Sequence, residues 1–201
     1  MSKETMISVT ADTPRLDALQ KSLGLAGVRK MNSRASSRLF ALVRRHLRML
    51  ASTRHATAQR LGAEPTGYFE KAYANTGHES DEKGGTVTVR APGFRRVFGD
   101  VLVLPVVANA LTIPVHPLSY GKRVSELQRD GITVVRPKGA SYLIKPNKDG
   151  SVELLYVLAR SALIRQDRSL LPSDEEMRSE VRKGYESAIQ AILNKQRDGD
   201  I

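Results

Sequence analysis

The spacing of apolar residues near the start of the chain predicts a long helix. From Val28 to Leu61 there is neither proline nor glycine, and apolar residues recur at steps of three and four. This period is typical of an amphipathic helix with one buried stripe. The stripe consists of Ala35, Leu39, Leu42, Val43, Leu47 and Leu50. A shorter helix is predicted over 13–23, and Gly24 and Gly27 separate it from the long one, so residues 1–27 are expected to form an N-terminal arm.

A second pattern begins after a polar stretch. Residues 64–85 are rich in glycine and charged side chains and predict a long connection with one short helix at 68–74. From Thr86 the apolar period becomes two, which is typical of strands. The predicted strands cover 86–90, 101–106, 110–115, 132–136, 141–146 and 151–159, with a short helical stretch at 123–128. Asn147 to Gly150 favours a tight hairpin turn, so we expect an antiparallel meander.

The last element has clear signals at both ends. Ser173 and Glu176 have the spacing of a capping box, and Lys195 and Arg197 lie near the other end. The apolar stripe contains Met177, Val181, Tyr185, Ala188, Ile189 and Ile192. We expect this helix to lie across the sheet. The predicted fold class is α+β, an antiparallel β-sheet flanked by a long basic N-terminal helix and a C-terminal amphipathic helix, with one domain over 28–195 and a frayed tail over 196–201.

Positive charge is concentrated on the long helix. The chain has a formal net charge of +11, and no acidic residue lies between Asp17 and Glu64. Five arginines project onto the side opposite the apolar stripe: Arg34, Arg38, Arg44, Arg45 and Arg48. Like charges on one face repel one another unless an anionic partner is present. Two interpretations stay open, an ordinary solvated surface or a face that meets an anionic partner, and nonspecific nucleic-acid binding is the second functional hypothesis.

The sequence offers no motif for chemistry. Gly121, Lys122 and Arg123 follow an apolar run, but a phosphate-binding loop needs a glycine five residues before its Gly-Lys pair and a hydroxyl after it, and these places hold His116 and Arg123. The four histidines lack zinc-site spacing, and there is no Gly-x-Ser-x-Gly elbow. We therefore predict no catalytic, cofactor-binding or metal-binding residues and no enzymatic activity. Lys122 and Arg123 are interpreted as contact candidates.

Two further features bear on location. The chain has no cysteine, and its polar first residues lack the apolar core of a signal peptide, so a protein made in a cytoplasm is expected. The longest apolar run, 101–115, is shorter than the roughly 20 residues that a membrane helix requires. We expect no membrane partner.

The order of several segments resembles a known family. These segments read GAEPTGYFEKA, TVTVRAPGFRRVFGD, ALTIPVHPLSYGKR and ELLYVLARSALIRQDRSLLPSDEE. In this order the chain resembles, over about residues 30–195, the phage virion morphogenesis proteins of Mu-like tailed phages, which are neck or tail-completion proteins. LTIPV with the following YGKR, and the passage ending LPSDEE, carry most of the resemblance. The first 27 residues and the segment around 77–84 depart from it.

The resemblance implies a structural role at the virion neck. It implies a subunit that oligomerises into a ring of six or twelve copies and joins the tail to the head connector, and it also implies an α+β fold. The expected partners are further copies of the chain, portal or adaptor proteins and tail proteins, with transient contact to genomic DNA. Assembly is expected in the host cytoplasm. Strands that are apolar on both faces, with edges marked by proline, fit contact with neighbouring copies, but burial of 101–115 as an ordinary strand pair fits them as well and is expected for most of these side chains.

Overall fold

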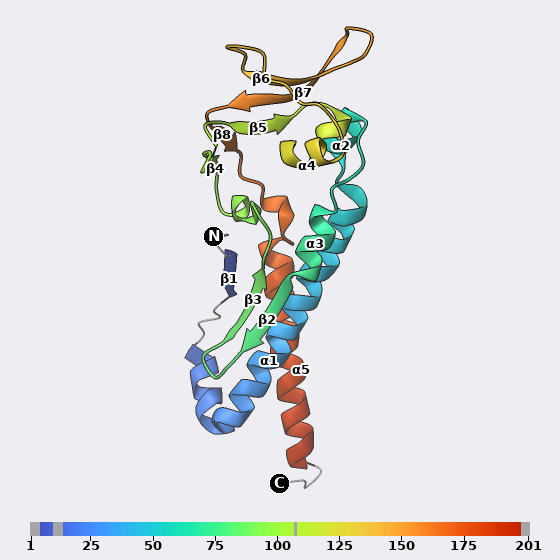
Figure 1. Cartoon of the computed structure of the whole chain (residues 1–201). Helices are drawn as coiled ribbons and strands as arrows, with labels where there is room; N and C mark the ends of the chain where they lie inside the picture. The colour runs from blue at the N-terminus through green and yellow to red at the C-terminus, as the bar shows by residue number, and fades with distance from the viewer. Residues whose placement is uncertain (1–4, 10–13, 107, 198–201) are drawn as a thin grey trace. The chain divides into compact units, whose positions relative to one another are not determined.

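Figure 1 shows the computed structural model of the chain, which describes residues 5–9, 14–106 and 108–197. The fold class is α+β, as predicted. The chain divides into two compact units. Unit 1 comprises Met1–Ala51, Phe69–Phe98 and Asp167–Ile201, and unit 2 comprises Ser52–Tyr68 and Gly99–Gln166. Residues 1–4 and 10–13 of the predicted arm, and 198–201 of the predicted tail, lie outside the described residues. The predicted arm and domain boundaries stay predictions.

The long helix forms, with its break where the sequence places it. Helix α1 spans Pro14–Thr53, and Gly24 interrupts it with a non-helical φ of 66° and ψ of 172°. Gly27 continues the helix. All six residues of the predicted apolar stripe are buried, which confirms the predicted orientation of that face. Helix α1 ends earlier than expected, and Ala56–Leu61 forms a separate helix, α2, which Gly62 terminates in the left-handed conformation.

A three-stranded antiparallel sheet belongs to unit 1. Its order is β1-β3-β2, with β1 at Thr5–Val9, β2 at Thr76–Ser80 and β3 at Gly85–Val89. Strand β3 and helix α3 (Tyr68–Ala74) were predicted, whereas β2 lies in the segment expected to be a connection. Strand β3 lies against α1, since a Cβ added at Gly85 would come within 2.6 Å of Ser36 Cβ.

Helix α5 packs on α1. It spans Asp174–Arg197, and the predicted capping box is present, because Glu176 Oε2 accepts from the Ser173 amide at 2.9 Å and Ser173 Oγ accepts from the Glu176 amide at 3.2 Å. A Cβ at Gly184 would meet Ala35 Cα at 2.5 Å, so the two helix backbones are in close contact. The expectation that this helix lies across the sheet missed this contact, which glycine and alanine at the crossing permit.

Unit 2 contains two further sheets rather than one continuous meander. Strands β4 (Val101–Val103) and β8 (Ala162–Ile164) form an antiparallel pair. The second sheet has the order β5-β7-β6 and consists of Leu111–Pro114, Val152–Ala159 and Tyr142–Pro146. The predicted turn joins β6 to β7, since the Asn147 amide donates to Ser151 O at 2.8 Å. The predicted strand at 132–136 was wrong; this segment contributes a single bridge from Val135 to Ile144.

A bulge in β7 determines which of its side chains are buried. Leu143 is opposite Tyr156 and Ile144 is opposite Leu154, so Leu155 is the extra residue. A bulge turns two successive side chains to the same side. Leu155 and Tyr156 therefore both pack against Leu127 of α4 (Val124–Arg129). Among the described residues there are also three short 3-10 helices, at Phe94–Val97, Pro117–Ser119 and Arg168–Leu170.

Candidate functional site

The sheet β5-β7-β6 has one face that no helix of unit 2 covers among the described residues. Helix α4 packs on the other face, as Figure 1 shows. On the uncovered face the cross-strand register aligns Ile113, Val157 and Tyr142 in one row. We define the open face as five residues that are all exposed although apolar or aromatic: Ile113, Tyr142, Val152, Leu154 and Val157. Val152, the most exposed of them, has a relative accessibility of 60%.

The two-stranded sheet of unit 2 adds a second exposed apolar pair. Leu102 on β4 is directly opposite Leu163 on β8, and their relative accessibilities are 60% and 53%. Single exposed leucines are ordinary, and only larger contiguous apolar patches mark contact surfaces, so this pair alone is weak evidence for one. Neither the open face nor this pair was named from the sequence. The signal available was that 151–159 is apolar at odd and even positions alike.

The Gly121–Lys122–Arg123 stretch forms a turn that connects β5 to α4. Gly121 has a φ of 73°, which favours glycine, and a Cβ there would lie 2.6 Å from Thr66 Cγ2, so the Thr66 side chain would also have to shift. Lys122 Nζ lies 2.8 Å from Asp130 Oδ2, and this hydrogen bond holds the pKa of Asp130 below its usual value. The Arg123 amide donates to Glu126 Oε2 at 2.7 Å and begins α4. Both cationic side chains are exposed.

Two of the five predicted contact arginines face α5. Arg34 Nη1 donates to the carbonyl of Ser187 at 2.7 Å and to its Oγ at 2.9 Å. Arg38 Nη1 is 3.3 Å from Glu180 Oε2. The pKa of Glu180 is lowered, first by its hydrogen bond from Lys183 and then by Arg38. Helix α1 has no acidic residue near these arginines. Their hydrogen-bond and ion-pair partners come from α5, more than a hundred positions away in the sequence.

Two other arginines face α3. The Arg44 guanidinium carbon lies 3.9 Å from the centroid of the Tyr73 ring, and that of Arg48 lies 4.8 Å from it. Arg48 Nη2 also donates to Tyr73 Oη at 2.8 Å. Arg45 is exposed between them, and its charge is one of the weaker causes that lower the pKa of Glu176, after hydrogen bonds from Ser173. The structure therefore divides the predicted arginine face into two halves with different neighbours.

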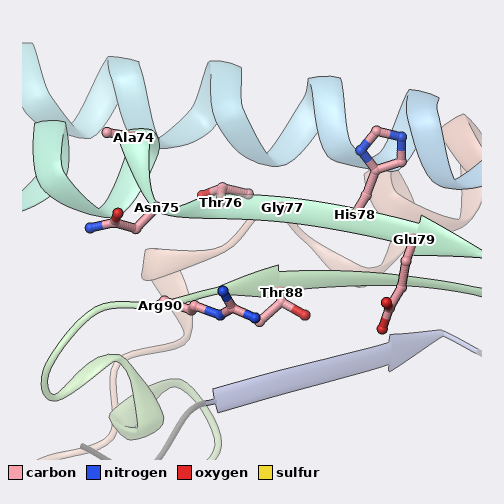
Figure 2. A pocket seen from close by; sticks show the side chains of 8 residues that line it. All are labelled: Ala74, Asn75, Thr76, Gly77, His78, Glu79, Thr88 and Arg90. Atoms are coloured by element: carbon pink, nitrogen blue, oxygen red, sulfur yellow. The ribbon is translucent and has the colours of Figure 1, made fainter.

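A polar groove of about 340 Å³ lies along β2 and β3 (Figure 2). Its lining includes Glu79 and His78 of β2 and Thr88 of β3. The His78 ring is directed toward α1, where it stacks on Phe40 at 4.5 Å and lies 3.2 Å from Ser37 Oγ. The imidazole is therefore engaged with the helix and is not directed at Glu79 or Thr88. We assign no reaction to this groove.

Other kinds of site are also lacking where the structure describes the chain. No three potential metal-ligating side chains come together among the described residues. None of the helices in the described ranges combines the length and the apolar character needed to cross a membrane. The two features that stand out are thus the open face of unit 2 and the arginine pair on Tyr73 in unit 1.

No protein-family model, curated protein or solved structure matches this chain.

Proposed function

We propose that this chain is a structural subunit of a phage head-tail junction, a neck or tail-completion protein that joins the tail to the head connector by oligomerising into a ring. The observation that carries the assembly role is the open face of β5-β7-β6. Apolar side chains occupy both sides of this sheet, and α4 covers only one of them. A contiguous apolar patch of a few hundred Å² is often a functional surface of a protein. The placement at the neck rests on the sequence resemblance.

The size of the open face bears on how the subunit assembles. Three strands about 4.8 Å apart and roughly 20 Å long present on the order of 300 Å². A stable interface buries about 800 Å² on each partner. The open face is therefore expected to be the centre of a contact that neighbouring surfaces complete. We expect the isolated subunit to associate weakly and to form its ring of six or twelve copies together with portal or adaptor and tail proteins.

The test places a charge on the open face. Val157→Lys is expected to leave the subunit folded, because the side chain is exposed, but to prevent its incorporation into virions. Gln128→Lys is the matched control, since it makes the same charge change on the exposed side of α4. Particles from both variants are imaged at the neck and analysed by mass spectrometry. A virion in which Val157→Lys is incorporated normally, or a wild-type virion without this chain, would contradict the proposal.

The alternative, nonspecific nucleic-acid binding through residues 34–48, remains a hypothesis that the observed contacts do not favour. Arg34 and Arg38 are engaged by α5, which reduces the number of phosphates that this face could neutralise. Duplex affinity measured at several salt concentrations tests it. Tight binding that weakens steeply as salt rises would support the alternative.

A further inference from the structure

Arg44 and Arg48 differ from Arg29 and Arg38, which lie on the same helix, in their partners. Arg29 and Arg38 each form a salt bridge with a glutamate, Glu82 and Glu180. Arg44 and Arg48 form none among the described residues, and the one hydrogen bond made by either guanidinium there goes to the Tyr73 hydroxyl. Both instead pack on the Tyr73 ring. Two adjacent positive charges are thus held together without a carboxylate between them.

The packing around Arg44 orients its donors. The side chain is half-buried, and its guanidinium lies over two rings, 5.2 Å from the Phe40 centroid and 3.9 Å from that of Tyr73. Its Nε is enclosed without a hydrogen-bond acceptor, whereas its terminal nitrogens are not among the enclosed atoms. The Arg48 guanidinium is restrained by its hydrogen bond to the Tyr73 hydroxyl. An anion that arrives therefore meets donors whose conformational freedom is already reduced, which favours binding.

We propose that Arg44 and Arg48 bind a side-chain carboxylate from an acidic segment of a partner protein. A guanidinium presents a planar fork of N–H donors that matches the two oxygens of a carboxylate. Two such groups on one ring, one of them bonded to its hydroxyl, form a compact receptor for a single planar anion. The arginine pair lies in unit 1 and the open face in unit 2, so this proposal does not rest on the proposed function.

The surroundings favour a carboxylate over nucleic acid. A nucleic-acid strand binds through a succession of phosphates and through bases that stack on aromatic rings. On this helix the Arg34 guanidinium is hydrogen-bonded to Ser187 and that of Arg38 is paired with Glu180, so the two cations nearer the N-terminus are directed at α5 and do not extend the arginine pair as a free row. The two rings are also occupied, since Phe40 stacks on His78 and Tyr73 packs against both arginines. One short acidic contact fits this arrangement better.

The test follows the arginine Nε–H signals by NMR during titration with a short polyglutamate peptide at low salt. A polyglutamine peptide of the same length is the ligand control. Arg48→Gln is expected to weaken polyglutamate binding about tenfold, which is typical of the loss of a charge-assisted hydrogen-bonded pair. Arg45→Gln is the matched control, because it removes the same charge from an exposed position of the same helix, and it is expected to change affinity by less than about twofold.

A third variant separates orientation from charge. Tyr73→Phe keeps the ring beneath both guanidinium groups but removes the hydroxyl that accepts from Arg48, so we expect roughly threefold weaker binding with all charges retained. Circular dichroism confirms that each variant is folded. Equal weakening by Arg45→Gln and Arg48→Gln would overturn the proposal, because it would show only nonspecific attraction. A short DNA duplex that binds more tightly than polyglutamate, with the same dependence on Arg48, would overturn it in favour of nucleic acid.

Discussion

The two three-stranded sheets that the structure describes differ in the polarity of their outer faces. In β1-β3-β2 the central strand alternates strictly, so Val87 and Val89 are buried while Thr86 and Thr88 point to the other side. In β5-β7-β6 the central strand is apolar on both sides. One side packs on α4 and the other is exposed. A polar outer face needs no partner, whereas an apolar outer face is stabilised by one.

The largest expected effect distinguishes the two sides of β7. Leu155→Ala removes a fully buried side chain and should destabilise unit 2 by about 3 kcal/mol. Leu154→Ala, its neighbour on the open face, should cost only about 0.5 kcal/mol. Native-state hydrogen exchange of the β7 amides measures both changes within the unit. Similar losses in the two variants would show that the open face is covered within the chain, and the contrast between the sheets would then disappear.

The next effect tests how closely α1 covers the first sheet. Gly85→Ala places a methyl group 2.6 Å from Ser36 Cβ, so either the strand or the helix must shift, at a cost of about 1 to 3 kcal/mol. Gly84→Ala is the matched control, since a Cβ there meets nothing within 4 Å. Chemical denaturation followed by far-UV circular dichroism compares the two. Equal stabilities would mean that β3 does not depend on its contact with α1.

A smaller effect is expected when the polarity of the two outer faces is exchanged. Val157→Thr makes the open face more polar, and Thr88→Val makes the outer face of β3 more apolar. Each should change the free energy of unfolding by no more than about 0.5 kcal/mol. Only Val157→Thr should reduce incorporation into virions, measured by quantitative mass spectrometry of purified particles. Reduced incorporation of Thr88→Val alone would place the assembly contact on the other sheet.

The smallest effect concerns pH and Glu153, on the covered side of β7. Hydrogen bonds from Asn147 and Lys145 hold the pKa of Glu153 below its ordinary value of 4.5. Folding thus favours the charged form, so this contribution to stability is present above pH 4.5 and is lost as the pH falls through the lowered pKa. Glu153→Gln should be less stable than wild type at neutral pH, and the difference should shrink in acid.

A matched control for this pH measurement lies on the first sheet. Glu79→Gln makes the same substitution at a side chain that forms no hydrogen bond or ion pair with the described residues, so it removes no such contact. Thermal denaturation between neutral and acidic pH compares the three proteins. A Glu153→Gln difference that persists unchanged in acid would assign its effect to packing rather than to charge.

Elements with local signals could be predicted from the sequence. The capping box at Ser173, the hairpin after Asn147 and the break at Gly24 all formed where expected, because neighbouring residues determine them. Strand β2 was missed because its sequence, TGHES, is polar and only its first residue, Thr76, is buried. It is held by pairing with β3 and by the contact of His78 with Phe40, which are tertiary interactions.

The candidate sites could be predicted only in part. Helical projection placed the five arginines on one side of α1, but it could not show that Ser187 and Glu180 would meet two of them or that Tyr73 would lie beneath two others. These partners come from distant elements. Likewise, the double-sided apolar character of β7 is visible in the sequence, but which side α4 covers depends on the bulge at Leu155.

The same bulge bears on how the register of β7 against its neighbouring strands is fixed. Because β7 is apolar at successive positions, a slip of one residue would still bury apolar side chains, and hydrophobicity alone discriminates weakly between the two alignments. Two hydrogen bonds between β7 and the segment that follows β5 favour one of these two alignments. Ser119 Oγ donates to Leu155 O at 2.6 Å, and Tyr156 Oη donates to Lys122 O at 3.0 Å. The LTIPVHPLSYGKR segment thus fixes the register of β7. That register in turn determines which side chains of β7 lie on the open face.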